Sequence, residues 1–83
     1  MNLVVLTPDK ELFHGTVVSV NVPAIGGRFE VLRGHAPIVA ALEKGEVRFQ
    51  PKKGEKRSIK IEQGFIEVLR DEVSLLVTGV TEQ

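Results

Sequence analysis

Two histidines, His14 and His35, are the side chains with the greatest potential for acid–base or metal chemistry. Imidazole titrates near neutral pH, so either could act as a general base beside a nucleophile. The chain has no cysteine, however, and Ser19, Ser58 and Ser74 lie inside alternating apolar patterns rather than on an exposed elbow. A zinc site needs three or four ligands at short spacings, which two distant histidines do not supply. We therefore predict no catalytic residue, no metal site and no cofactor.

The glycine pair Gly26-Gly27 is the one segment that could cradle a phosphate. No Gly-Lys-Ser/Thr follows it and no helix is expected after it, so it lacks the features of a P-loop and is better explained as a turn. Arg28 and Arg33 flank a segment that contains the apolar residues Phe29, Val31 and Leu32. Arginine beside exposed apolar side chains is typical of a protein contact, although scattered arginines also occur on ordinary solvated faces.

These side chains must be positioned by β-strands, because apolar residues recur with a period of two. The alternation is clearest in residues 17–22, 46–50, 58–62 and 73–78. Residues 3–6 and 38–42 are apolar at successive positions, which predicts strands covered on both faces, at a corner between sheets or under a partner. Glycine and proline turns separate the strands at short intervals. The pattern predicts one all-β domain over residues 1–83, a sandwich or a small barrel.

The composition excludes several functional classes. The 83 residues carry 11 basic and 11 acidic side chains, which disfavours a nucleic-acid partner, and the only aromatic residues are four phenylalanines. No segment approaches the ~20 apolar residues of a membrane helix, so membrane association is expected only through partners. The absence of cysteine favours the cytosol. The isolated domain is expected to be a monomer.

Four segments together resemble one family, the epsilon subunit of ATP synthase, which is called delta in mitochondria. The central match is Gly-His-Ala-Pro at residues 34–37, inside a similar stretch that runs from residue 20 to 42. The others are Thr7-Pro8 followed by Phe-His-Gly at 13–15, Gln-Gly-Phe-Ile-Glu-Val at 63–68, and the strand at 73–77. The resemblance covers nearly the whole chain in order.

This resemblance implies a flattened β-sandwich of about ten short strands. It also implies a non-catalytic rotor subunit of the central stalk, which binds the gamma subunit, contacts the c ring and couples ion-driven rotation to ATP synthesis. Such a subunit would be peripheral, on the cytoplasmic face of the bacterial inner membrane. The family's two C-terminal helices inhibit ATP hydrolysis and in some members bind ATP. The 83 residues contain no counterpart, so we expect neither activity here, whether the chain is naturally short or truncated. The alternative is a generic protein-interaction sandwich unrelated to the synthase.

The resemblance also assigns candidate contact residues. Those for the c ring are Arg28, Phe29, Glu30, Leu32 and Arg33, and those for gamma are His35, Ile38, Ala40 and Leu42. Two positions depart from the family pattern, because Glu30 replaces a usual glycine and Arg33 a usual proline. We expect residues 26–35 to form a loop that rests on the c ring. The strand at 38–42 is expected to be apolar on both faces because gamma covers one of them.

Overall fold

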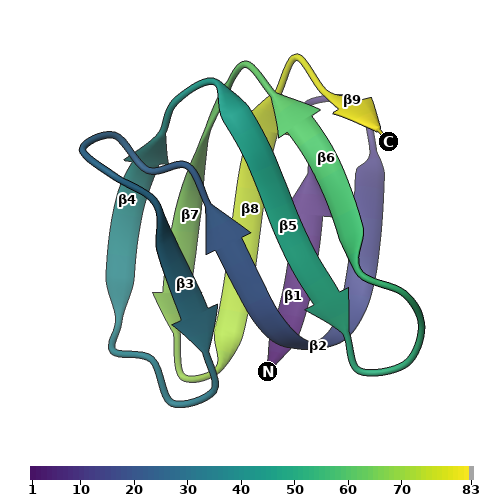
Figure 1. Cartoon of the computed structure of the whole chain (residues 1–83), viewed down its shortest axis with the longest axis vertical. Helices are drawn as coiled ribbons and strands as arrows, with labels where there is room; N and C mark the ends of the chain where they lie inside the picture. The colour runs from purple at the N-terminus through teal and green to yellow at the C-terminus, as the bar shows by residue number, and fades with distance from the viewer. Residues whose placement is uncertain (83) are drawn as a thin grey trace.

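The computed structural model describes residues 1–82, and within that range it consists of nine β-strands and no helix (Figure 1). The strands are β1 (Asn2–Leu6), β2 (Glu11–Val22), β3 (Phe29–Leu32), β4 (Ile38–Leu42), β5 (Gly45–Pro51), β6 (Arg57–Ile61), β7 (Gln63–Leu69), β8 (Glu72–Thr78) and β9 (Thr81–Glu82). The predicted all-β sandwich is confirmed.

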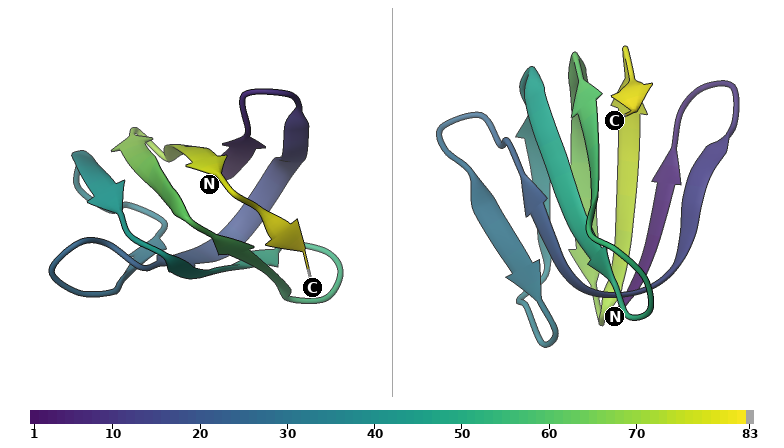
Figure 2. Two further views of the ribbon diagram at one scale, coloured as in Figure 1. Left: turned by 90° about the horizontal axis from the view of Figure 1, so that it is seen from above. Right: turned by 45° about the vertical axis from the view of Figure 1, so that its right-hand side comes forward.

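The strands form two facing layers that share β2 (Figure 2). Layer A has the order β4-β7-β8-β1 followed by the first half of β2, and layer B has the order β3, the second half of β2, β5, β6 and β9. Every pairing is antiparallel except that of β1 with β8. Because β2 has 12 residues, it bends from one layer into the other and closes that side of the sandwich.

The core lies between the layers and follows from the alternation in the sequence. In β7, for example, Ile66 and Val68 are buried while Phe65 and Glu67 point outward. Among the described residues no polar or charged residue is buried, and Phe49 has the largest of the fully buried side chains. A core made mainly of β-branched side chains suits strands, because these residues lose little rotamer freedom on a pleated surface.

The Gly-His-Ala-Pro segment is anchored by the turn between β7 and β8. Gly34 has φ 84°, a conformation that favours glycine, and its N–H donates to Asp71 Oδ1 at 2.8 Å. The Asp71 carbonyl accepts a second bond, from the Asn2 N–H at 2.9 Å. Asp71 and the preceding Arg70 both have positive φ, as a two-residue hairpin turn between right-twisted strands requires. One residue therefore holds three chain segments together.

Replacing Asp71 with alanine should lower the free energy of unfolding by about 1–2 kcal/mol, through the lost hydrogen bond and the poorer fit of alanine to positive φ. In a domain of this size that corresponds to a fall in Tm of roughly 4–16 °C, measurable by circular dichroism. Asp71→Asn is the matched control, because asparagine keeps the acceptor oxygen and tolerates positive φ. Equal losses of stability in the two variants would contradict the role assigned to the side-chain oxygen Asp71 Oδ1.

Candidate partner-binding faces

The five residues predicted to touch the c ring do not lie on one loop. Residues 29–32 form strand β3, which pairs with β2 (Figure 1). Arg28 and Arg33 flank this strand in the sequence and therefore lie at its opposite ends. Five residue-to-residue steps along an extended chain separate their backbones by roughly 16 Å. The expected loop over residues 26–35 is therefore wrong: it is a turn, a strand and a second turn.

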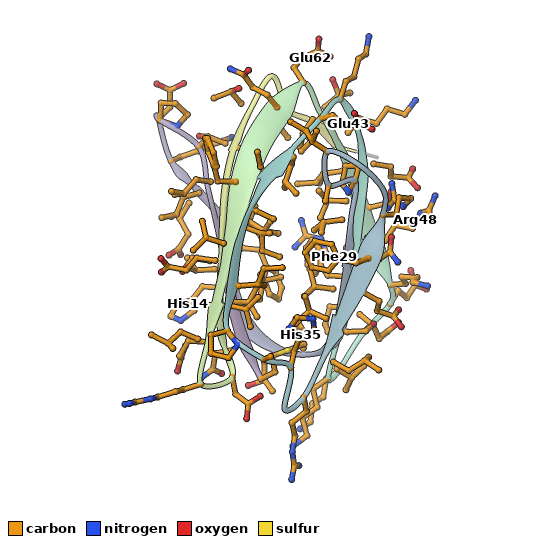
Figure 3. The ribbon with its side chains drawn as sticks, turned by 90° about the vertical axis from the view of Figure 1, so that its left-hand side faces the viewer. His14, Phe29, His35, Glu43, Arg48 and Glu62 are labelled. Atoms are coloured by element: carbon orange, nitrogen blue, oxygen red, sulfur yellow. The ribbon has the colours of Figure 1, made fainter. Side chains whose placement is uncertain are left out.

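The side chains of β3 alternate between the two surfaces of layer B. Glu30 and Leu32 point outward and are exposed, whereas Phe29 is half-buried against the core. Figure 3 shows Phe29 and His35 pointing into the space between the layers, at the side where β3 faces β4. Their ring centroids are 6.1 Å apart, and the ring planes are inclined by 28°. His35 Nδ1 lies 2.6 Å from the Ala36 carbonyl oxygen. Phe29 and His35 thus close the open side of the sandwich rather than project from it.

The predicted gamma contacts on β4 face inward. Leu42 is 2% exposed and belongs to the core, so its side chain cannot reach a partner. Ile38 and Ala40 share its face and pack against the same core. The side chain that β4 presents to solvent is that of Val39, which is 69% exposed. The expectation that this strand is apolar on both faces holds, but the outward residues are Val39 and the half-buried Ala41.

A row of apolar side chains crosses the outer face of layer A, and we call it the apolar row. It consists of Ala41 on β4, Phe65 on β7, Leu76 on β8 and Leu6 on β1, which are direct cross-strand partners in that order. Phe65 and Leu76 are 57% and 52% exposed. Neighbours at this spacing pack against one another, so the row is a continuous apolar surface rather than four separate side chains.

The apolar row borders a groove of about 450 Å³. Ile25, which is 66% exposed, lines the groove from the turn before β3, and its N–H donates to the Ala41 carbonyl at 3.0 Å. Thr7 and Pro8 line it as well, in the turn that follows β1. The groove therefore combines a flat apolar sheet with two loop walls, an arrangement suited to an apolar segment of another protein.

Phe65 is not among the contact residues predicted from the sequence. The signal was present, because the strand at 63–69 alternates and its core positions are occupied by Ile66 and Val68. An aromatic residue at the opposite phase of such a strand must point outward. Ile25 carried no comparable signal, since it lies in a turn.

Gly64 lets β7 approach β8 closely beneath this surface. A Cβ atom at this position would lie 2.6 Å from the Leu76 carbonyl oxygen and 2.9 Å from Val77 Cγ1. We expect Gly64→Ala to lower the free energy of unfolding by about 1–3 kcal/mol, because backbone must move to make room. Gly15→Ala is the control, since its Cβ would first meet the movable tip of the Phe13 ring at 3.2 Å. Urea unfolding measures the loss of free energy of unfolding in each variant. Equal losses in Gly64→Ala and Gly15→Ala would show that β7 and β8 separate easily.

The outer face of layer B is polar around Arg28, in contrast to the apolar row on layer A. Arg28 lies across it: its Nε and Nη2 donate to Asn21 Oδ1 at 2.9 and 2.6 Å, and Nη2 also donates to the Glu46 carbonyl at 2.6 Å. Beside it, Arg48 Nε donates to the Glu46 carboxylate. This bond to Arg48 is the main reason that the pKa of Glu46 lies below its ordinary value. Arg28 is thus the one c-ring candidate whose side chain is held in a defined orientation by several hydrogen bonds.

Among residues 1–82, no group of three or more histidine or acidic side chains is arranged to hold a metal ion. The same residues contain no helix that is long and apolar enough to cross a membrane.

Comparison with known proteins identifies the family. The family model "ATP synthase, Delta/Epsilon chain, beta-sandwich domain" matches residues 1–83. The ATP synthase epsilon chain of Chlorobium limicola is 40% identical over 77 residues, which cover 93% of this chain and 88% of that protein. The epsilon chain of Leptospira borgpetersenii is 44% identical over 77 residues, 92% of this chain but only 59% of its own length.

Two solved structures share the fold. A chain of the Euglena gracilis mitochondrial ATP synthase, solved with OSCP, F1 and the c-ring, superposes with a TM-score of 0.88 at 22% identity, over 96% of this chain and 51% of that one. A chain from the central stalk and c-ring of the Tetrahymena thermophila mitochondrial ATP synthase superposes with a TM-score of 0.83 at 16% identity, over 98% of this chain and 65% of that one. Through the family match and the bacterial relatives, this chain belongs to the delta/epsilon family of ATP synthase subunits and represents its β-sandwich domain.

Proposed function

We propose that this chain is a non-catalytic rotor subunit of a bacterial ATP synthase. It binds the gamma subunit, contacts the c ring and turns with both, so that ion-driven rotation of the ring reaches the catalytic subunits. It does so on the cytoplasmic face of the inner membrane, which it reaches through these partners. The observation that carries the proposal is that one sandwich presents two unlike outer faces, one with the apolar row on layer A and one with the polar cluster around Arg28 on layer B.

The gamma subunit is proposed to cover layer A. An obligate contact within a permanent assembly is expected to be apolar and well packed, and the apolar row with its groove is the surface of that kind here. Val39 and Ile25 extend this surface, and both are exposed large hydrophobic side chains. Their exposure in the isolated chain is explained if a partner covers them.

The c ring is proposed to meet the end of the domain where β3 begins. Arg28 and the outward Glu30 are the polar members of the predicted set nearest that end, and Arg28 is held in position by Asn21. A charged contact of this kind fixes the orientation of a partner more than it adds affinity. The two structural relatives come from ATP synthase assemblies that include a c-ring, which supports a place for this domain in a rotor.

Transmission of torque requires a part that does not deform. The two layers share the continuous strand β2, and the bridge between Ala24 and Leu42 joins them again on the side of β3 and β4. A close-packed core between sheets linked in this way has low compressibility. The domain is therefore suited to carry a load between two partners.

Co-purification with the synthase tests the proposal. The tagged chain is expressed in its source cells, the membranes are solubilised in mild detergent, and the bound proteins are identified by mass spectrometry. We expect gamma and the c subunit to be recovered together, and purified gamma alone to bind the chain in gel filtration. Intact synthase in the same membranes with no gamma or c subunit on the tagged chain would overturn the proposal.

A further inference from the structure

The guanidinium group of Arg28 is oriented by the fold and keeps part of its donor capacity. Arginine has five N–H groups, and the three hydrogen bonds to Asn21 and to the Glu46 carbonyl use those on Nε and Nη2. Nη1 has two N–H groups and no acceptor among residues 1–82. Nη1 lies beside Gly45, 3.9 Å from the position that a Cβ atom would occupy there. Because glycine has no side chain, this space next to Nη1 is not filled by residue 45.

The surroundings of Arg28 favour an anion. Arg48 is close enough to lower the pKa of Arg28, after the larger effect of burial, and it already engages the carboxylate of Glu46. Lys60 lies opposite Glu46 on β6 and adds another positive charge. Glu30 on β3 is the cross-strand neighbour of Asn21 and supplies no hydrogen bond to Arg28. The cations Arg28, Arg48 and Lys60 therefore outnumber the two carboxylates around them, those of Glu46 and Glu30. The Glu46 carboxylate already accepts a hydrogen bond from Arg48.

We propose that Arg28 is a preorganised receptor for a carboxylate on a loop of the c ring, with Asn21 as its positioning residue. This inference rests on the proposed function and adds the chemistry of the contact. The Nη1 group donates charge-assisted hydrogen bonds to an aspartate or glutamate side chain, which are shorter and stronger than bonds between neutral groups. Because Asn21 and the Glu46 carbonyl hold the fork, little side-chain freedom is lost on binding. Lysine has no such fork and cannot be held in this way.

A binding comparison with two partners tests the proposal. The affinity of the chain is measured for purified gamma alone and for gamma assembled with the c ring. For Arg28→Gln we expect about a tenfold weaker affinity for the assembled partner and no change for gamma alone, consistent with the loss of one charge-assisted contact. Asn21→Ala should act in the same direction. Lys52→Gln is the control, since Lys52 is an exposed cation on the turn between β5 and β6 and should change neither affinity.

Chemical modification of the ring identifies the acceptor. Carboxylates of the purified c ring are converted to neutral amides with a carbodiimide and an amine before gamma is added. The unmodified chain should then bind no better than Arg28→Gln, because its acceptor has been removed. A tenfold difference that persists on the amidated ring would overturn the carboxylate, and equal affinities on the native ring would overturn the role of Arg28. Failure of every chain to bind gamma would instead reject the proposed function.

Discussion

Replacing Phe65 with glutamate should weaken the affinity of the chain for gamma by at least about thirtyfold and leave the fold intact. A buried aromatic side chain at the centre of an interface commonly contributes 2 kcal/mol or more, which corresponds to about that factor. Phe65 lies between Ala41 and Leu76 in the apolar row, so the introduced carboxylate would be buried among apolar groups without a partner. Because Phe65 is 57% exposed in the isolated chain, the free energy of unfolding should change by only about 0.5 kcal/mol. Isothermal titration with purified gamma, together with a thermal melt, measures both quantities.

Val18→Glu is the matched control for this experiment. Val18 lies on β2 outside the apolar row and is 52% exposed, so it receives the same change in charge at similar exposure. It should bind gamma as the unmodified chain does. If Phe65→Glu also binds normally while gamma binding itself is demonstrated, then gamma uses a different surface, and the placement on layer A must be abandoned.

The strands could be predicted from the sequence because burial alternates along them. The phase of that alternation is readable wherever polar residues mark the outer face, as Arg48 and Glu46 do in β5. In β4 every residue is apolar, so the sequence contained no indication of which side chains face the core, and we assigned Ile38, Ala40 and Leu42 to the wrong side. Only the pairing of β4 with β7 decides the phase, and this pairing joins residues more than 20 positions apart.

The candidate sites depend even more on distant pairing. Arg28 could be identified as unusual from its place beside an apolar segment, but the Asn21 side chain and the Glu46 carbonyl that hold it come from two other strands. Their proximity follows from the register of β2 with β5, which includes a bulge. The alternation in the sequence does not by itself show where a bulge lies. Where a bulge occurs, one extra residue moves every later side chain of the strand to the opposite face. The family motifs predicted the fold and the family correctly, while the three-dimensional neighbours determine the chemistry of each contact.

Replacing Phe49 with alanine should remove a large share of the free energy of unfolding. Phe49 is 1% exposed and packs on Phe13, with ring centroids 4.7 Å apart, and the Arg57 guanidinium lies 5.5 Å from its centroid. Loss of a buried phenylalanine costs about 3–5 kcal/mol, whereas a domain of this size is stable by only about 4–12 kcal/mol.

Urea unfolding followed by circular dichroism measures this effect, and the midpoint should fall steeply. Phe49→Leu is the control, because it keeps most of the buried volume and should cost clearly less.

The comparison also bears on the rotor function. A sandwich with a cavity at its centre should bind gamma with an unchanged surface, but less folded protein is available to bind. Binding that recovers fully when Phe49→Ala is stabilised by excess gamma would show that the partner contributes to folding. If Phe49→Ala instead retains the stability of the unmodified chain, the aromatic pair is not the centre of the core. The rigidity proposed for torque transmission must then come from the shared strand β2 and the bridge between Ala24 and Leu42.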